Sequence, residues 1–240
     1  LAIDPDDADT HNNLGITLGE LERLDDAILS YEKALSIKPD YAEVYNNLGF
    51  IFLKLRRLDD AYKSNKKALI LKPELAEGYA AQGLILTELK QLDGALESYY
   101  RVRAINPKLA YNLGAILNTK MNLCNWDDLP ALLNELKNKI NNNEKVIVPF
   151  DLLGLIDDPE LQGKASEIYA NDEFPKSDSL PNIGLYPKHK KIRIGYFSAD
   201  FRIHPVATLT AELYETHDRD QFEIHAFSFG PNTKDEMNLR

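Results

Sequence analysis

The chain has 240 residues, with 28 Lys and Arg against 38 Asp and Glu, and a formal net charge of −10. This length allows one or two domains, and a hydrophobic fraction of 44% argues against disorder of the whole chain. The excess of acidic residues disfavours nucleic-acid binding. The sequence lacks an apolar run long enough to span a membrane, and its single cysteine, Cys124, excludes an intrachain disulfide. We therefore expect a cytoplasmic protein with neither nucleic-acid nor membrane partners.

An internal repeat dominates the first half of the chain. Prolines recur every 34 residues, at Pro5, Pro39, Pro73 and Pro107. The same phase is kept by Gly15, Gly49 and Gly83, and by Ala27, Ala61 and Ala95. A 34-residue helix–turn–helix period is typical of tetratricopeptide repeats. We predict full repeats over 8–41, 42–75 and 76–109, with 1–7 as the tail of an earlier repeat, which also suggests that the chain is a fragment.

Such repeats stack into an αα-superhelix whose concave face is lined by the first helix of each pair. Asn13 and Asn47 lie two residues before the repeat glycine, whereas Ala81 takes this place in the third repeat and Asn112 resumes the motif out of phase. Amides both donate and accept, so a row of them facing solvent can hold the backbone of an extended peptide without reading its side chains. Alternatively, these asparagines are only solvated helix-surface positions.

Residues 110–143 read as a degenerate helical pair, off register with the repeats. We expect helices over 110–118 and 127–140, with Cys124 and Trp126 in the turn between them. Trp126 is more often a packing anchor than a ligand platform. Residues 144–187 read as a linker with one helix, which begins at Asp158-Pro159 and ends near Ala170.

The last region, 188–240, changes period. Apolar residues alternate over 191–197, a helix begins at Pro205 and ends near Glu215, and a second strand spans 221–229. Strand–helix–strand predicts a parallel pair, and a two-stranded parallel sheet is too small to be a domain. The fold class is therefore mainly α, with a repeat superhelix followed by the first βαβ unit of a larger α/β domain.

Few residues carry chemistry. The sequence has no phosphate-binding glycine loop and no zinc-ligand pattern, so we expect no metal site. Asp218-Arg219-Asp220 precedes a strand, which is the wrong context for a metal-binding Asp-x-Asp motif. His204 lies in the loop after the first strand and directly precedes Pro205, at which a helix begins. The loops that follow the strands are where α/β folds place their sites. The N-terminus of a helix also favours the neutral form of a nearby imidazole, which can accept a proton. Alternatively, His204 merely begins the helix.

The combination of motifs resembles the protein O-linked N-acetylglucosamine transferase family and its bacterial relatives. The resemblance rests on three features beyond the repeats: the Cys-Asn-Trp-Asp turn, the stretch from Lys191 to Pro205 that reads Lys-Ile-Arg-Ile-Gly-Tyr-Phe-Ser-Ala-Asp-Phe-Arg-Ile-His-Pro, and Asp220-Gln-Phe-Glu leading to Ser228-Phe-Gly-Pro. The stretch that ends in His-Pro is its specific part.

The resemblance implies a GT-B glycosyltransferase with two Rossmann-like lobes, a UDP-sugar donor such as UDP-GlcNAc, inversion at the anomeric carbon and no metal requirement. It implies that Asn13, Asn47 and Asn112 line the groove for acceptor polypeptides, from which Ala81 departs. It also implies that His204 is an active-site histidine and candidate base. We expect an N-terminal fragment without the donor-binding lobe, inactive by itself, binding no cofactor, and able to self-associate through its repeats.

Two other interpretations stay open at this point. The chain could be a repeat scaffold that only binds proteins, or part of a related enzyme that transfers fucose, or glucose onto asparagine.

Overall fold

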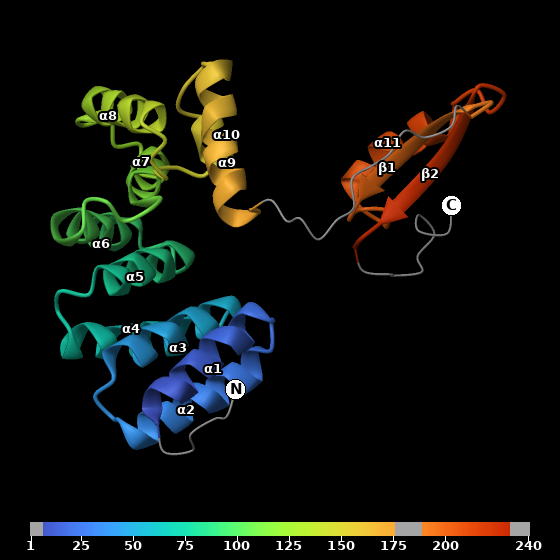
Figure 1. Ribbon diagram of the computed structural model, residues 1–240. Helices are drawn as coiled ribbons and strands as arrows, with labels where there is room; N and C mark the ends of the chain where they lie inside the picture. Colours follow the sequence, from blue (N-terminus) through green and yellow to red (C-terminus); the bar gives the residue numbers. More distant parts are fainter. Residues whose placement is uncertain (1–6, 176–188, 231–240) are drawn as a thin grey trace. The chain divides into compact units, whose positions relative to one another are not determined.

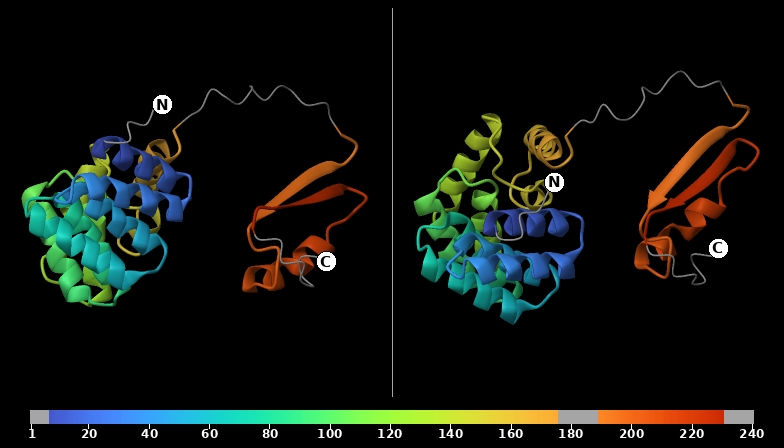
Figure 2. Two further views of the ribbon diagram at one scale, coloured as in Figure 1. Left: turned by 90° about the horizontal axis from the view of Figure 1, so that it is seen from below. Right: turned by 60° about the horizontal axis from the view of Figure 1, so that its bottom comes forward.

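The computed structural model describes residues 7–175 and 189–230 and divides the chain into two compact units, Leu1–Lys176 and Ser177–Arg240. Three helix hairpins open the first unit (Figure 1). They are α1 (Ala8–Glu20) with α2 (Leu24–Ile37), α3 (Ala42–Lys54) with α4 (Leu58–Leu71), and α5 (Ala76–Glu88) with α6 (Leu92–Ile105). Figure 2 shows the successive hairpins stacked on one another. The predicted tetratricopeptide fold is confirmed.

The repeat prolines lie just after the second helices. Each of α2, α4 and α6 ends two residues before Pro39, Pro73 and Pro107, respectively. The first proline of the series, Pro5, and the predicted tail over 1–7 lie outside the described residues apart from Asp7. Asp7 caps α1, because its carboxylate accepts hydrogen bonds from the backbone N–H groups of Asp9 and Thr10.

The turn inside each hairpin uses a residue in the left-handed conformation. These residues are Glu22, Arg56 and Lys90, with φ of 57°, 60° and 61°. The next residue then donates its N–H five residues back, as Arg23 does to the Leu18 carbonyl at 2.9 Å. This is the Schellman ending of a helix, which usually employs glycine. Its recurrence every 34 residues shows that the period specifies the turns as well as the helices.

The repeat glycines let an aromatic side chain pack against the first helix. A Cβ at Gly15 would lie 2.5 Å from the Tyr31 ring, and one at Gly83 would lie 2.4 Å from the Tyr99 ring. The second repeat differs, because Asn65 stands where the others carry tyrosine and a Cβ at Gly49 would meet nothing closer than 3.5 Å. Asn65 is fully buried and donates to the Gly78 carbonyl at 2.8 Å.

Residues after the repeats continue the same hydrophobic core. The helices are α7 (Asn112–Asn122), α8 (Leu129–Asn141), α9 (Pro149–Leu153) and α10 (Pro159–Glu173). The core residues from this part include Ile116, Leu117, Leu136, Ile140, Val146, Ile147 and Leu152. Residues 144–175 are therefore packed and contain two helices, where the sequence predicted a linker with one. Asp158 caps α10 as predicted, accepting from the Leu161 N–H.

The turn that contains Trp126 shows one wrong prediction. Trp126 is 54% exposed, so it does not anchor the packing. That role belongs to Lys120, which is 3% exposed and donates to the Asn125 amide oxygen at 2.9 Å. The same oxygen accepts the Asp127 N–H, so a buried lysine and an asparagine organise the turn.

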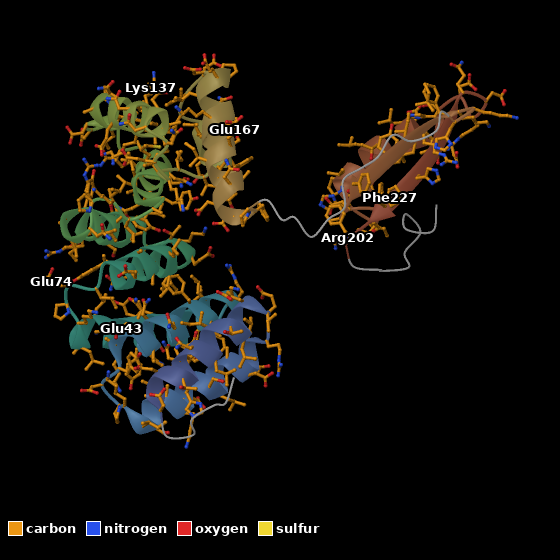
Figure 3. The ribbon with its side chains drawn as sticks, viewed as in Figure 1. Glu43, Glu74, Lys137, Glu167, Arg202 and Phe227 are labelled. Carbon is orange, nitrogen blue, oxygen red and sulfur yellow. The ribbon has the colours of Figure 1, made fainter. Side chains whose placement is uncertain are left out.

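The second unit is a strand–helix–strand motif. β1 (Ile192–Ser198) and β2 (Phe222–Ser228) pair in parallel, with Ile192 opposite Phe222 and Ser198 opposite Ser228. Between them, α11 (Pro205–Glu215) covers one face of the sheet, where Tyr196 contacts Tyr214 with their ring centroids 4.7 Å apart. On the other face Phe197 and Phe227 stack with their ring centroids 4.6 Å apart. Figure 3 labels Phe227 on β2. The parallel pairing is confirmed; residues 176–188 and 231–240 lie outside the described part.

Candidate functional site

Two regions contain the candidate residues, one on the repeats and one at the ends of the strands. On the repeats, α1, α3 and α5 form what we call the first-helix face. Asn13 lies exposed on α1, and Asn47 lies half-buried on α3. Asn47 Nδ2 donates to the side-chain oxygen of Asn12 at 3.0 Å, which ties the two helices together.

A shallow groove of about 170 Å³ opens on the first-helix face between α1 and α3. Its lining includes Asn47 together with Ile16, Glu20, Phe50 and Lys54. Of these residues, only Asn47 was predicted as part of a site. The others were missed, although Ile16 and Phe50 keep the 34-residue phase of the repeats and could have been found by following it.

Asn112 does not belong to this surface. It is 9% exposed and begins α7, where its Nδ2 donates to the Tyr99 carbonyl at 3.1 Å. Its side-chain oxygen is buried without a hydrogen-bond partner among the described residues. The expectation that its amide faces solvent is therefore wrong, because the off-register start of α7 turns this asparagine into the interface with α6. Ala81 is fully buried on α5.

In the second unit, His204 lies after the carboxyl end of β1 and caps α11. Its Nδ1 accepts the Val206 N–H at 3.3 Å, and its carbonyl accepts the Thr208 N–H at 3.1 Å. A capping side chain satisfies one of the helix's free N–H groups. In this arrangement the neutral ring carries its proton on Nε2, since Nδ1 is an acceptor.

The loop that leads from β1 to His204 brings charged groups close to its ring. Asp200 Oδ2 lies 3.7 Å from His204 Nδ1, and Asp200 Oδ1 lies 3.7 Å from the Arg202 guanidinium. Both separations exceed hydrogen-bond length. Asp200 itself is oriented by Ser198, whose Oγ accepts its N–H at 3.0 Å. Sequence reasoning named His204 but missed Asp200 and Arg202.

The end of β2 is held against the same loop. The Phe229 N–H donates to the Ser198 carbonyl at 3.3 Å. A Cβ at Gly230 would fall 1.9 Å from the Ala199 carbonyl oxygen, so only glycine fits there. The loop after β1 is thus fixed at the carboxyl edge of the sheet, the edge at which α/β folds bind ligands.

The described residues contain neither a candidate metal cluster nor a candidate membrane-spanning helix. Within 7–175 and 189–230, no group of three or more His, Cys, Asp or Glu side chains is placed to hold a metal ion. None of the helices described over these ranges could span a lipid bilayer.

Comparison with known proteins gives matches to both regions. Tetratricopeptide repeat families match residues 19–55 and 42–75, and glycosyl transferase family 41 matches residues 180–240. A probable UDP-N-acetylglucosamine–peptide N-acetylglucosaminyltransferase, SEC, from Arabidopsis thaliana is 26% identical over 140 residues. That match covers 52% of this chain and 14% of the plant protein.

One solved structure is similar along nearly the whole chain. A K341M mutant of the Thermobaculum terrenum O-GlcNAc transferase matches with a TM-score of 0.51 and 17% identity, over 97% of this chain and 39% of that one. At 17% identity the match supports a similar fold and nothing further. Taken together, the matches confirm the resemblance to the protein O-linked N-acetylglucosamine transferase family: tetratricopeptide repeats are followed in this chain by a segment that matches glycosyl transferase family 41.

Proposed function

We propose that this chain is part of a UDP-sugar-dependent protein glycosyltransferase, in which the repeats hold the acceptor polypeptide. The observation that carries the proposal is the family 41 match over residues 180–240, downstream of the repeats. Since the chain spans 14% of its curated relative, the activity is that of a longer protein. UDP-GlcNAc as the donor and a cytoplasmic location are parts of the same proposal.

On the repeats, Asn13 and Asn47 are the amides that remain available to an acceptor. One N–H of Asn47 is used by Asn12, which leaves its other N–H and its oxygen for a peptide backbone. Asn112 is left out of the proposed contact surface because its amide is buried. Replacing the exposed Asn13 by Ala should weaken peptide binding and leave the melting temperature nearly unchanged. Asn47→Ala should weaken peptide binding and also lower the melting temperature, because it removes the hydrogen bond to the buried Asn12.

In the second unit we propose that His204 receives the proton of the acceptor hydroxyl. A hydroxyl is a weak nucleophile at neutral pH, so attack on the anomeric carbon gains from a positioned base. In the structure the Nδ1 lone pair of His204 accepts the Val206 N–H, so the proton of the neutral ring is on Nε2. For Nε2 to accept a proton, Nδ1 must carry the hydrogen instead, and the Asp200 carboxylate, 3.7 Å away, must come within hydrogen-bond length to accept it.

The capping bond also favours a second candidate role, in which His204 only begins α11 and the chain acts as a protein-binding scaffold. Two substitutions in the full-length protein separate the roles. His204→Asn keeps a good helix cap but removes the base, whereas His204→Ala removes both. If His204 is the base, both variants should lower kcat by about 10²–10⁴-fold. The His204→Asn variant should nevertheless remain folded, because asparagine still caps the helix.

If His204 is only a cap, His204→Asn keeps turnover near wild type and His204→Ala loses thermal stability. The assay measures transfer of labelled sugar from UDP-GlcNAc to a protein acceptor, with a melting curve for each variant. Failure of the wild-type full-length protein to transfer from UDP-GlcNAc, UDP-glucose or GDP-fucose would favour the scaffold.

A further inference from the structure

One row of apolar side chains on the first-helix face has no role in the core. Ile16, Phe50 and Leu84 occupy the same position in the three repeats, on α1, α3 and α5. Ile16 is 38% exposed, Leu84 is 43% exposed and Phe50 is half-buried. We call these three residues the apolar row. Exposed apolar side chains that recur once per repeat form an ordered surface, unlike a scatter of single residues.

The apolar row runs beside the amide positions. Each of its members follows the repeat's asparagine position by three residues, 13 to 16, 47 to 50 and 81 to 84. Residues three apart on a helix share a face, so Ile16 and Phe50 each neighbour an asparagine that we assign to backbone binding, whereas Leu84 neighbours the buried Ala81. Ile16 and Phe50 in fact line one groove with Asn47.

The spacing between Ile16 and Phe50 is set by direct packing of α1 on α3. Lys54 Nζ reaches the Gly19 carbonyl at 3.3 Å, and a Cβ at Gly19 would lie 2.9 Å from Ile51. Helices in such contact lie about 8–10 Å apart. Lys54, at the edge of the groove, is paired with Glu22 at 2.8 Å, so its charge is compensated within the protein. With the charge of Lys54 compensated, the groove offers a ligand the apolar side chains of Ile16 and Phe50 beside the polar groups of Asn47 and Glu20.

A polyproline II segment has the matching period. It rises about 3.1 Å per residue with three residues per turn, so side chains at every third position lie on one face about 9 Å apart. In a β-strand, by contrast, side chains three apart point to opposite faces. We infer that the first-helix face selects polypeptide segments in the polyproline II conformation that carry an apolar side chain at every third residue. This inference rests on the proposed function and adds a side-chain preference to its backbone contacts.

The test measures binding of three labelled short peptides to the 240-residue chain by fluorescence anisotropy. The peptides share one proline-rich composition: the first has leucine at every third position, the second has the same leucines at alternate positions, and the third has glutamine in their place. We expect the first peptide to bind about tenfold more tightly than the others, because its leucines bury apolar surface against the apolar row. Leu84→Ser and Ile16→Ser should remove this preference.

Matched controls keep the result interpretable. Leu29→Ser changes a side chain that is 64% exposed on α2, away from the first-helix face, and should leave all three affinities unchanged. Circular dichroism confirms that each variant is folded. Equal binding of the three peptides would overturn the inference and leave the proposed backbone contacts standing. No binding of any peptide would overturn the inference together with the proposed role of the repeats.

Discussion

The repeats and the strand–helix–strand unit contain similar apolar side chains but bury them to very different extents. In the repeats Ala27, Val44 and Ile85 are fully buried, whereas in the second unit Leu209 is 82% exposed and Phe197 is 71% exposed. Ala207 is the one buried hydrophobic residue within 189–230. A repeat completes its core with its neighbour, but two parallel strands and one helix leave a sheet face uncovered. Local stability should therefore differ strongly between the two regions.

Hydrogen exchange provides the most sensitive test of this difference. Backbone amides of β1 and β2 should exchange at least about a hundredfold faster than amides in the middle of α3 to α6, because little apolar burial opposes their opening. The measurement is hydrogen–deuterium exchange with mass spectrometry on the 240-residue chain at neutral pH. Protection of 192–198 equal to that of the repeats would contradict the comparison and imply that further contacts cover the sheet.

Glycine substitutions test the comparison inside the repeats themselves. Gly15→Ala forces a Cβ to within 2.5 Å of the Tyr31 ring, which should destabilise the first unit by about 1–3 kcal/mol. Gly49→Ala is the matched control, because its nearest neighbours lie at 3.5 Å. There the helix preference of alanine should increase stability by up to about 1 kcal/mol.

Urea unfolding monitored by circular dichroism gives both free energies of unfolding. A loss at Gly49 as large as that at Gly15 would mean that the glycines serve some purpose other than admitting the tyrosine ring. Gly83→Ala, with Tyr99 at 2.4 Å, should behave like Gly15→Ala.

The sequence predicted the repeats well because one feature, the 34-residue period, reports helices, turns and packing at the same time. It predicted the parallel pair for a related reason, since strand patterns on either side of a helix leave few topologies. The period could not reveal which of two adjacent asparagines is buried. Asn12 is buried and Asn13 exposed, a difference set by the rotation of α1 against α3.

Where the period is lost, prediction became weaker. Asn112 carries the same Asn-Leu-Gly motif as Asn13, yet α7 begins with this residue, after Tyr111 in the left-handed conformation, and so its amide is turned into the core. The exposed Trp126 was likewise misjudged, because a buried lysine, Lys120, took the place of an apolar anchor. Asp200 and Arg202 lie in the stretch that carries the family resemblance, but only the loop geometry shows that both lie near His204.

The hairpin turns offer a smaller and opposite change in stability. Lys90 has φ of 61°, a conformation that costs an ordinary residue about 1 kcal/mol relative to glycine. Lys90→Gly should therefore stabilise the first unit by about 1 kcal/mol in thermal or urea unfolding. Glu22→Gly relieves the same strain but removes the contact with Lys54 at 2.8 Å, so its gain should be smaller. Equal losses for both variants would show that the backbone is not strained there.

The smallest expected effect concerns pH. Asp172 on α10 pairs with Lys145 and accepts a hydrogen bond from the Tyr111 hydroxyl at 2.7 Å. These two hydrogen bonds lower the pKa of Asp172 below its ordinary value of 3.8, the one from Lys145 more than the one from Tyr111. A carboxyl whose pKa is lower in the folded state stabilises that state above its unfolded pKa, and the contribution is lost as pH falls through the folded pKa.

The first unit should accordingly lose stability as the pH falls from 5 toward 3, and Asp172→Asn should flatten this dependence while lowering stability at pH 7. Tyr111→Phe removes one of the two bonds and should give an intermediate slope. The measurement is the free energy of unfolding in urea at several pH values, followed by tryptophan fluorescence and circular dichroism. Because this contact joins α10 to the start of α7, it reports whether residues 144–175 are part of the repeat core, as the structure has them, or a linker, as the sequence suggested. A pH dependence that is the same in wild type and Asp172→Asn would favour the linker.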